Sequence, residues 1–242
     1  GLYKAFTELD CSLIEINQPD VKILTVEDPV EYQMPGINQI QVKPQINLTF
    51  ANALRSIVRQ DPDVIMIGEI RDLETAEIAV QSALTGHLVL STVHTNDAPS
   101  TVNRLLDMGV DDYLLTSTVI GILAQRLVRT LCENCKEPHV ALPEIVEQMG
   151  LARFSSEKEI TLYRPKGCPQ CAQTGYSGRV SIMEMLPMTD PLRSLVMKHA
   201  NAADLKAEAI RERMLTMYED GMRKAVRGIT TFEEVGRVTR EA

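Results

Sequence analysis

Two cysteine pairs carry the clearest chemical pattern in the sequence. Each C-x-x-C pair places two thiols in one tight turn, at Cys132 and Cys135 and again at Cys168 and Cys171. Four thiolates satisfy tetrahedral Zn²⁺, and such a closed site is structural because no coordination position stays open. We therefore predict a zinc module, although the spacer is longer than usual and four reduced, buried thiols are the alternative. Cys11 is predicted to be a packed free thiol.

Acidic residues follow two apolar runs that are typical of buried strands. Val21–Val26 is followed by Glu27 and Asp28, and Val64–Ile67 leads closely into Glu69. An apolar run that ends in an acid is the Walker B pattern. Hydrolysis of a nucleotide with Mg²⁺ needs acidic groups for the ion and for the attacking water. A solvated carboxylate at a strand end is the alternative interpretation of each acid.

Four basic or titratable side chains complete the set of candidates. Arg55 and Arg59 are four residues apart on one face of a predicted helix. They either lie in solvent or stabilise phosphate charge across a subunit boundary. His87 and His94 belong to a third apolar run, 87–95, where a histidine is more often a satisfied core residue than a catalytic one.

Helix signals separate these predicted strands. Thr49 and Asp72 suit helix N-caps, and Asp97 with Pro99 suits the start of another helix. A longer helix is predicted over 113–129, and the C-terminal third has helical periodicity. Strands that alternate with helices form a parallel sheet, whose ligands bind outside the carboxyl ends of its strands. Glu27, Asp28, Glu69 and His94 are expected at that edge.

Composition limits the class of protein. The 242 residues include 44% hydrophobic side chains but no Trp, so the core is expected to be aliphatic. The net charge of −8 argues against a protein that mainly grips nucleic acid. The longest apolar stretches are too short to span a membrane, and the first residues lack the apolar core of a signal peptide. The sequence therefore predicts a cytoplasmic protein.

Four segments in order resemble the motifs of the bacterial secretion ATPase superfamily. The segment 23–32 looks like its aspartate box, 59–72 like its Walker B region, and 84–96 like its histidine box. The run 123–129, followed directly by the cysteine module, is similar to the E-type ATPases of type II secretion and type IV pilus extension. The resemblance covers nearly the whole chain from Val21 onward.

The resemblance implies a RecA-like α/β motor domain that assembles as a hexamer with ATP between its subunits. It implies that ATP hydrolysis drives export of pilin-like subunits through an inner-membrane platform protein, to which the motor is peripheral. In this family Glu27 would be the catalytic acidic residue and Glu69 the Walker B glutamate. His87 and His94 would couple the nucleotide to domain motion, and the arginines would lie at the subunit boundary.

The chain departs from the family in lacking the phosphate-binding G-x-x-x-x-G-K-[ST] loop. The family places that loop just upstream of a segment similar to Leu2-Tyr3, so the chain is expected to begin immediately after it and to be inactive alone. Residues 10–19 are also longer than the family pattern. We predict a partial ATPase core over 1–131, the zinc module over 132–180 and a helical subdomain over 181–242.

Two other classes of protein stay open at this point. One is a zinc-ribbon protein that binds nucleic acid, against which the acidic charge and the lack of interleaved basic and aromatic residues argue. The other is an assembly scaffold that has kept the fold and lost the chemistry. The presence of Glu27, Glu69, His87 and His94 together argues against the scaffold.

Overall fold

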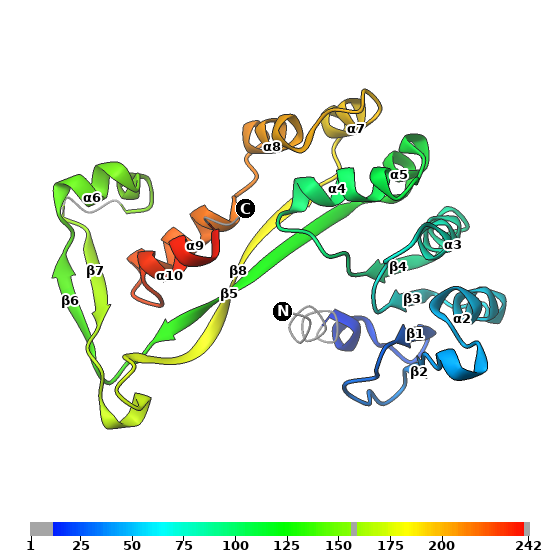
Figure 1. Cartoon of the computed structure of the whole chain (residues 1–242), viewed down its shortest axis with the longest axis horizontal. Coiled ribbons are helices and arrows are strands. Elements are labelled where there is room, and N and C mark those ends of the chain that lie inside the picture. The colour runs from blue at the N-terminus through cyan, green and yellow to red at the C-terminus, as the bar shows by residue number, and fades with distance from the viewer. Residues whose placement is uncertain (1–11, 156–158, 240–242) are drawn as a thin grey trace. The chain divides into compact units, whose positions relative to one another are not determined.

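The computed structural model describes residues 12–155 and 159–239, which form two compact units (Figure 1). Unit 1 contains the chain up to residue 95 together with 99–120 and 188–205. Unit 2 contains 96–98, 121–187 and the chain from 206 onward. Cys11 lies outside the described residues.

Unit 1 is built on a parallel sheet of four strands, as the alternating pattern predicts. The strands are β1 (Ile23–Glu27), β2 (Asn38–Gln41), β3 (Val64–Ile67) and β4 (Leu88–Ser91). Their order across the sheet is β2-β1-β3-β4. All neighbouring strands are parallel, so their carboxyl ends share one edge. The predicted α/β class with a parallel sheet is confirmed.

Helices connect these strands and begin where the capping residues predict. Thr49 accepts from the Asn52 N–H at 3.3 Å, and Asp72 accepts from the Thr75 N–H at 2.8 Å. Such caps satisfy backbone donors that have no partner inside the helix. The helices of this unit are α2 (Phe50–Ile57), the 3-10 turn η2 (Val58–Gln60), α3 (Leu73–Leu84), α5 (Asp112–Thr118), α7 (Asp190–Val196) and most of α4 (Ala98–Asp107).

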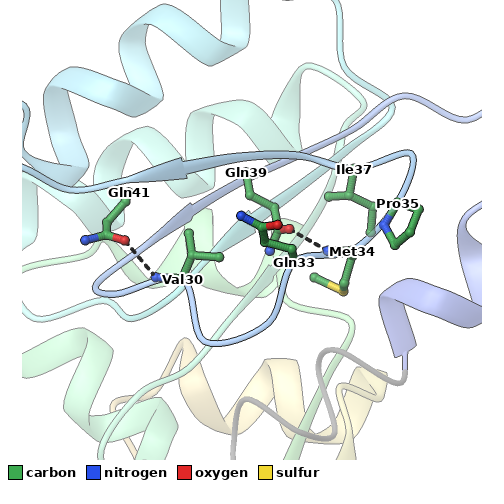
Figure 2. A pocket seen from close by; sticks show the side chains of 7 residues that line it. All are labelled: Val30, Gln33, Met34, Pro35, Ile37, Gln39 and Gln41. Atoms are coloured by element: carbon green, nitrogen blue, oxygen red, sulfur yellow. Dashed lines mark hydrogen bonds between the residues drawn. The ribbon is translucent and has the colours of Figure 1, made fainter.

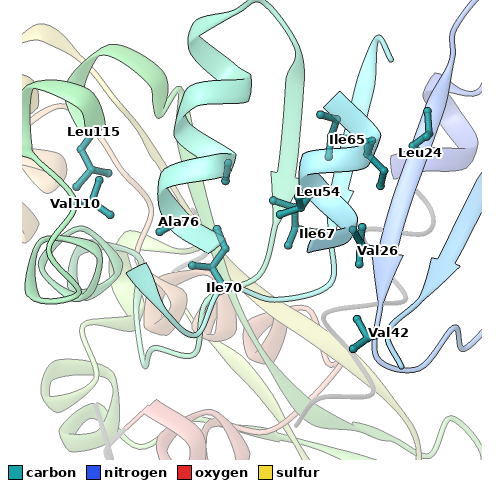
Figure 3. Packing of buried hydrophobic residues seen from close by; sticks show 13 residues of the cluster. Leu24, Val26, Val42, Leu54, Ile65, Ile67, Ile70, Ala76, Val110 and Leu115 are labelled. Atoms are coloured by element: carbon teal, nitrogen blue, oxygen red, sulfur yellow. The ribbon is translucent and has the colours of Figure 1, made fainter. Parts of the chain in front are cut away.

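The two faces of the sheet carry different cores because side chains alternate along each strand. Leu24, Val26, Ile65 and Ile67 point to the face covered by α2 and α3 (Figure 3). The opposite face has a smaller cluster that includes Ile23, Val64 and Met66. Thr25 and Glu27 alternate with Leu24 and Val26, so they lie on this second face. Fully burying an aliphatic side chain contributes about 1.5–3 kcal/mol, so both faces fix the register.

The predicted helix over 113–129 is wrong. The helix α5 ends at Thr118, and the chain continues as the long strand β5 (Gly121–Leu131). β5 pairs antiparallel with β8 (Tyr176–Pro187), which is distant in sequence. The pairing buries alternate residues such as Val128 and Ile182, and this long-range burial outweighs local helix propensity.

Unit 2 contains this β5–β8 ribbon. A second antiparallel pair joins β6 (Lys136–Val140) to β7 (Thr161–Pro165). The helices are α6 (Pro143–Gln148), α9 (Met217–Val226), α10 (Phe232–Thr239) and the second half of α8 (Ala202–Arg211). Short 3-10 turns are η3 (Leu151–Arg153) and η4 (Pro169–Cys171) here and η1 (Pro44–Ile46) in unit 1. No helix among the described residues is long and apolar enough to cross a membrane.

The C-terminal methionines Met214, Met217 and Met222 are all buried. Thr231 and Glu234 form only half of a capping box. The Glu234 N–H donates to the Thr231 hydroxyl at 3.3 Å, but the Glu234 carboxylate is taken up by two arginines. The division of the chain at residues 131 and 180 stays a prediction. The second of these boundaries falls within β8, which runs from Tyr176 to Pro187.

Candidate functional site

Two buried carboxylates lie at the carboxyl edge of the sheet in unit 1. Glu27 is the last residue of β1, and Glu69 follows β3 after Gly68. Val26 pairs in register with Ile67, so the two neighbouring strands end together. Glu27 is 1% exposed and Glu69 is 4% exposed, whereas Asp28 is exposed. The structure therefore brings the two acids to one edge, as the strand pattern predicts.

One oxygen of Glu27 is held by two donors. The Thr25 hydroxyl donates to Oε1 at 2.5 Å, and the Gln39 amide Nε2 donates to the same oxygen at 3.0 Å. In the part of the chain that the structure describes, Oε2 accepts no hydrogen bond. A buried carboxylate normally uses more of its acceptor capacity. Glu27 thus keeps an unused acceptor.

Glu69 has partners on both oxygens. Arg71 forms an ion pair with Oε1, and Nε2 of His94 lies 3.2 Å from Oε2. His94 is mostly exposed, and it follows the end of β4 as predicted. The segments after β3 and β4 are cross-linked, because the Thr92 hydroxyl donates to the Gly68 carbonyl at 2.6 Å. That bond links the segment that carries His94 to the segment that carries Glu69.

His87 lies at the other edge of the sheet. It precedes the first residue of β4, and its Nδ1 lies 2.8 Å from the Ser82 carbonyl oxygen and 3.0 Å from the Thr85 hydroxyl. A carbonyl oxygen only accepts, so Nδ1 carries a proton. A four-residue strand rises about 13 Å, and the structure therefore does not bring His87 together with Glu27, Glu69 and His94.

The two arginines are exposed on α2 and η2. Arg55 forms an ion pair with Glu74 at 2.5 Å, with both side chains about half exposed. Arg59 lies in the turn that leads to the amino end of β3, and within the described residues it has no ion pair or hydrogen bond. These contacts do not connect either arginine to the carboxyl edge of the sheet, and both side chains are exposed.

The four predicted metal ligands converge in unit 2. All four sulfur atoms lie within 4.8 Å of one another. Three of the Sγ–Sγ distances are 3.8 Å (Cys132 to Cys168), 3.8 Å (Cys135 to Cys171) and 3.7 Å (Cys168 to Cys171). A Zn–S bond of about 2.3 Å in a regular tetrahedron requires an Sγ–Sγ edge of about 3.8 Å. The thiols are free, and their spacing fits a tetrahedral metal ion.

Polar groups around the sulfurs favour thiolates at two positions. A hydrogen bond from the Asn134 amide lowers the pKa of Cys168 to about 6. Burial acts to raise the pKa of Cys171, but N–H donors of Cys168 and Gly175 outweigh it and lower the pKa. Burial raises the pKa of Cys135 to about 12. Cys168 and Cys171 are thus biased toward the thiolate form, which is the form that binds a soft cation.

The close turn around these sulfurs depends on Gly175. Its N–H donates to Sγ of Cys171 at 3.1 Å, and its φ of +75° lies in the left-handed region. A Cβ at this position would lie 2.3 Å from Cβ of Pro165. Only glycine lets the backbone come close enough for the bond.

Sequence reasoning missed four residues that contact the candidates, namely Thr25, Gln39, Arg71 and Asn134. Arg71 and Asn134 are next to or near motif residues in sequence, so their proximity was a usable signal. Gln39 had no local signal, because it reaches Glu27 only through pairing of β2 with β1.

Comparison with known proteins places these features in a family. The family model for "Type II/IV secretion system protein" matches residues 5–237. The type II secretion system protein E of Xanthomonas campestris is 61% identical over 98% of this chain, which spans 41% of that protein. The type IV pilus assembly ATPase PilB of Thermus thermophilus is 50% identical over 97% of the chain, which spans 26% of it. The chain thus spans less than half the length of these relatives.

Solved structures agree with this placement. The pilus retraction motor PilT, crystallised with bound ADP, superposes with a TM-score of 0.70 at 28% identity and covers 96% of this chain. The chain in turn covers 57% of PilT. The ATPase DotB of Legionella pneumophila, at 22% identity and a TM-score of 0.67, shares the fold. By its matched residues and its relatives, the chain belongs to the Type II/IV secretion system protein family.

Proposed function

We propose that this chain is a portion of the catalytic domain of a motor ATPase that drives a type II secretion system or the assembly of a type IV pilus. The observation that carries the proposal is the pair of buried acids, Glu27 and Glu69, at the ends of adjacent parallel strands. Ligands of such sheets bind outside this edge. A relative that binds ADP, the retraction motor PilT, supports ATP as the nucleotide.

Each acid has a distinct role in this proposal. Glu27 orients the attacking water and takes its proton through the unused oxygen Oε2. The water oxygen bonds to the γ-phosphorus, and the bond to the bridging oxygen breaks with its electron pair leaving on ADP. Mg²⁺, when bound, neutralises charge on the phosphates. Glu69 would be the Walker B acid, which would hold that ion through bound water.

The basic candidates divide into two groups. His94 contacts Glu69, so we propose that it reports the state of the nucleotide to the chain that follows. His87 shares that role in the family pattern, but from the opposite edge of the sheet it would act through a further contact. Arg55 and Arg59 are exposed, which suits contact with a neighbouring subunit of a homo-oligomer, a hexamer in the family pattern.

We propose Zn²⁺ as the ion held by Cys132, Cys135, Cys168 and Cys171. Four thiolates at tetrahedral spacing leave no open coordination position, so the ion would be structural. We further propose that the motor is cytoplasmic and acts on an inner-membrane platform protein. ATP hydrolysis would then drive the export of pilin-like subunits.

The proposal predicts that turnover needs more than this chain. No G-x-x-x-x-G-K-[ST] loop occurs among the 242 residues, and that loop supplies the amides and Lys that grip the phosphates. Residues 1–242 alone should hydrolyse ATP no faster than buffer. A protein extended to the length of the relatives should turn over ATP with Mg²⁺.

The experiment measures steady-state phosphate release by the extended protein and by its Glu27→Gln variant. Loss of a catalytic base costs about 10²–10⁴-fold in kcat. We expect a fall in this range with unchanged nucleotide affinity, measured with a fluorescent ATP analogue. No turnover by the extended protein, or full turnover by Glu27→Gln, would contradict the proposed function.

A further inference from the structure

The register of β1 and β2 collects three polar side chains on one face of the sheet. Thr25 and Glu27 are two residues apart on β1, so they point to the same face. Gln39 of β2 pairs in register with Thr25, so it points there too. A slip of one residue would turn Gln39 to the opposite face. The sheet itself therefore builds the contact between Gln39 and Glu27.

The Gln39 amide is fully used. Its Oε1 accepts from the Met34 N–H at 2.7 Å, and its Nε2 donates to the Tyr32 carbonyl at 2.8 Å and to Glu27 at 3.0 Å. The orientation of the amide is fixed by its partners, since an N–H can only donate and a carbonyl can only accept. The amide group must therefore present its N–H to the carboxylate.

Gln39, which contacts Glu27, also forms one wall of a hollow. The hollow has a volume of about 580 Å³, and the loop from Val30 to Ile37 forms its other side (Figure 2). Gln39 reaches that loop through Met34, whereas Gln41 reaches it through a 3.4 Å bond from the Val30 N–H (Figure 2). Two glutamines of one strand thus line the same hollow, but among the described residues only Gln39 donates a hydrogen bond to Glu27.

We propose that Gln39 is a positioning residue for the Glu27 carboxylate, acting together with the Thr25 hydroxyl. Both donors hold Oε1, which fixes the rotation of the carboxylate and directs Oε2 away from them. This inference rests on the proposed function, because the position of Oε2 matters only if that oxygen meets the attacking water. A misplacement of about 1 Å is enough to cost a large factor in rate.

The test compares Gln39→Leu with Gln41→Leu in the extended protein. Both variants remove one amide from the same strand and the same hollow, but only the first takes a donor from Glu27. Loss of a hydrogen bond to a charged group predicts a fall of about tenfold in kcat for Gln39→Leu with KM within about twofold. Gln41→Leu should stay within about twofold of the parent in kcat.

A double-mutant cycle separates positioning from a structural role. In a Glu27→Gln background, Gln39→Leu should cause no further loss of kcat, because the group that it positions is already disabled. If Gln39→Leu does not fold, Thr25→Val removes the other donor at nearly constant shape. Thr25→Val should lower kcat by about tenfold, whereas Thr25→Ser, which keeps the hydroxyl donor, should keep the kcat of the parent.

The outcomes distinguish this inference from the proposed function. If Glu27→Gln loses turnover but Gln39→Leu behaves like Gln41→Leu, the positioning role is overturned and the ATPase stands. An equal loss from Gln39→Leu in both backgrounds also overturns it. If Glu27→Gln keeps full turnover, the proposed function itself has failed.

Discussion

Both units contain buried glutamates, but Glu27 in unit 1 and the two buried glutamates of unit 2 differ in how many of their carboxylate oxygens accept hydrogen bonds. In unit 1, Glu27 is 1% exposed and uses only one oxygen among the described contacts. In unit 2, Glu184 and Glu234 are 3% and 2% exposed, and both oxygens of each are occupied. Desolvating a carboxylate without full compensation is costly. An unused oxygen on a buried glutamate therefore helps to separate a functional acid from a structural one.

Glu184 on β8 joins the starts of two helices. Its Oε1 accepts from the Ala98 N–H at 2.8 Å, and its Oε2 accepts from the Met217 N–H at 3.1 Å. Ala98 and Met217 are the first residues of α4 and α9. Backbone donors at a helix start lack partners inside the helix, and the helix dipole favours negative charge there. Glu184 therefore has a complete structural explanation.

Glu234 on α10 is held by two arginines. Arg129 donates to it through its guanidinium at 2.6 Å and through its backbone N–H at 3.1 Å, and Arg237 donates at 3.1 and 3.0 Å. Burial acts to raise the pKa of Glu234, but these donors outweigh it and lower the pKa to about 2. This acid is also satisfied by its own fold.

The comparison teaches how to separate structural acids from functional ones in one chain. A structural acid has its oxygens filled from within, so substitution should cost stability. A functional acid keeps acceptor capacity for a partner that is not part of the fold, so substitution should cost turnover. Glu69 is intermediate, since both oxygens are paired but its partners Arg71 and His94 are mostly exposed.

The largest effect is expected from removing cysteine ligands in unit 2, which tests whether the four-cysteine site has a structural role. Cys132→Ser combined with Cys135→Ser should abolish binding of about one zinc per chain. Structural zinc supplies about 10–16 kcal/mol of apparent binding free energy, so residues between 132 and 171 should lose amide protection. Metal analysis and hydrogen exchange measure the two results.

Cys11→Ser is the matched control, because it removes a thiol that is not one of the four. It should keep its zinc and its exchange pattern. Full zinc content in the double variant would contradict the metal assignment and remove the cysteines from the structural side of the comparison.

A smaller effect is expected at Glu234, and it depends on pH. A folded pKa of about 2 against an ordinary 4.5 means that the ion pairs stabilise the fold above pH 4.5 and stop doing so as pH falls toward 2. Glu234→Gln should therefore lower the free energy of unfolding by about 3 kcal/mol at pH 7. The gap between variant and parent should close as the pH falls through that range.

Urea unfolding at a series of pH values measures this gap. Glu147→Gln, an exposed acid on α6, should show almost no difference from the parent at any pH. A Glu234→Gln deficit that stays the same down to pH 2 would show that the stabilisation does not come from the ionised carboxylate.

The smallest effect is expected at Glu184, where it sharpens the contrast with Glu27. Glu184→Gln keeps one acceptor and turns an NH₂ group toward a backbone N–H, so it should cost about 2 kcal/mol of unfolding free energy. Glu27→Gln keeps the oxygen that accepts from Thr25 and Gln39, so its cost should be below about 1 kcal/mol. Urea unfolding of both variants decides, and equal losses would erase the distinction.

The sequence was sufficient for features that depend on local pattern. Strand ends with acids, helix caps at Thr49 and Asp72, and the convergence of the four cysteines all follow from spacing and residue type. The parallel sheet follows from alternation of strands and helices, and it places Glu27 and Glu69 at one edge without any further information.

The remaining features depend on long-range pairing, which no local pattern contains. β5 forms a strand because β8, about fifty residues away, offers it a partner. Gln39 reaches Glu27 only because β2 pairs with β1 in one register. The prediction of a strand over 87–95 included both histidines, but the strand is only Leu88–Ser91. His87 precedes this strand and His94 follows it, so the two histidines lie at opposite edges of the sheet.

The order β2-β1-β3-β4 has a practical consequence for handling this chain by itself. One border of the sheet is the polar run Asn38–Gln41, whereas the other is β4, with Leu88 39% exposed and no strand partner on its outer side among the described residues. Unpaired apolar borders act as templates for pairing with a second molecule. Self-association of the isolated chain should therefore start at β4, and a charged substitution at Leu88 is the change that would keep it dispersed.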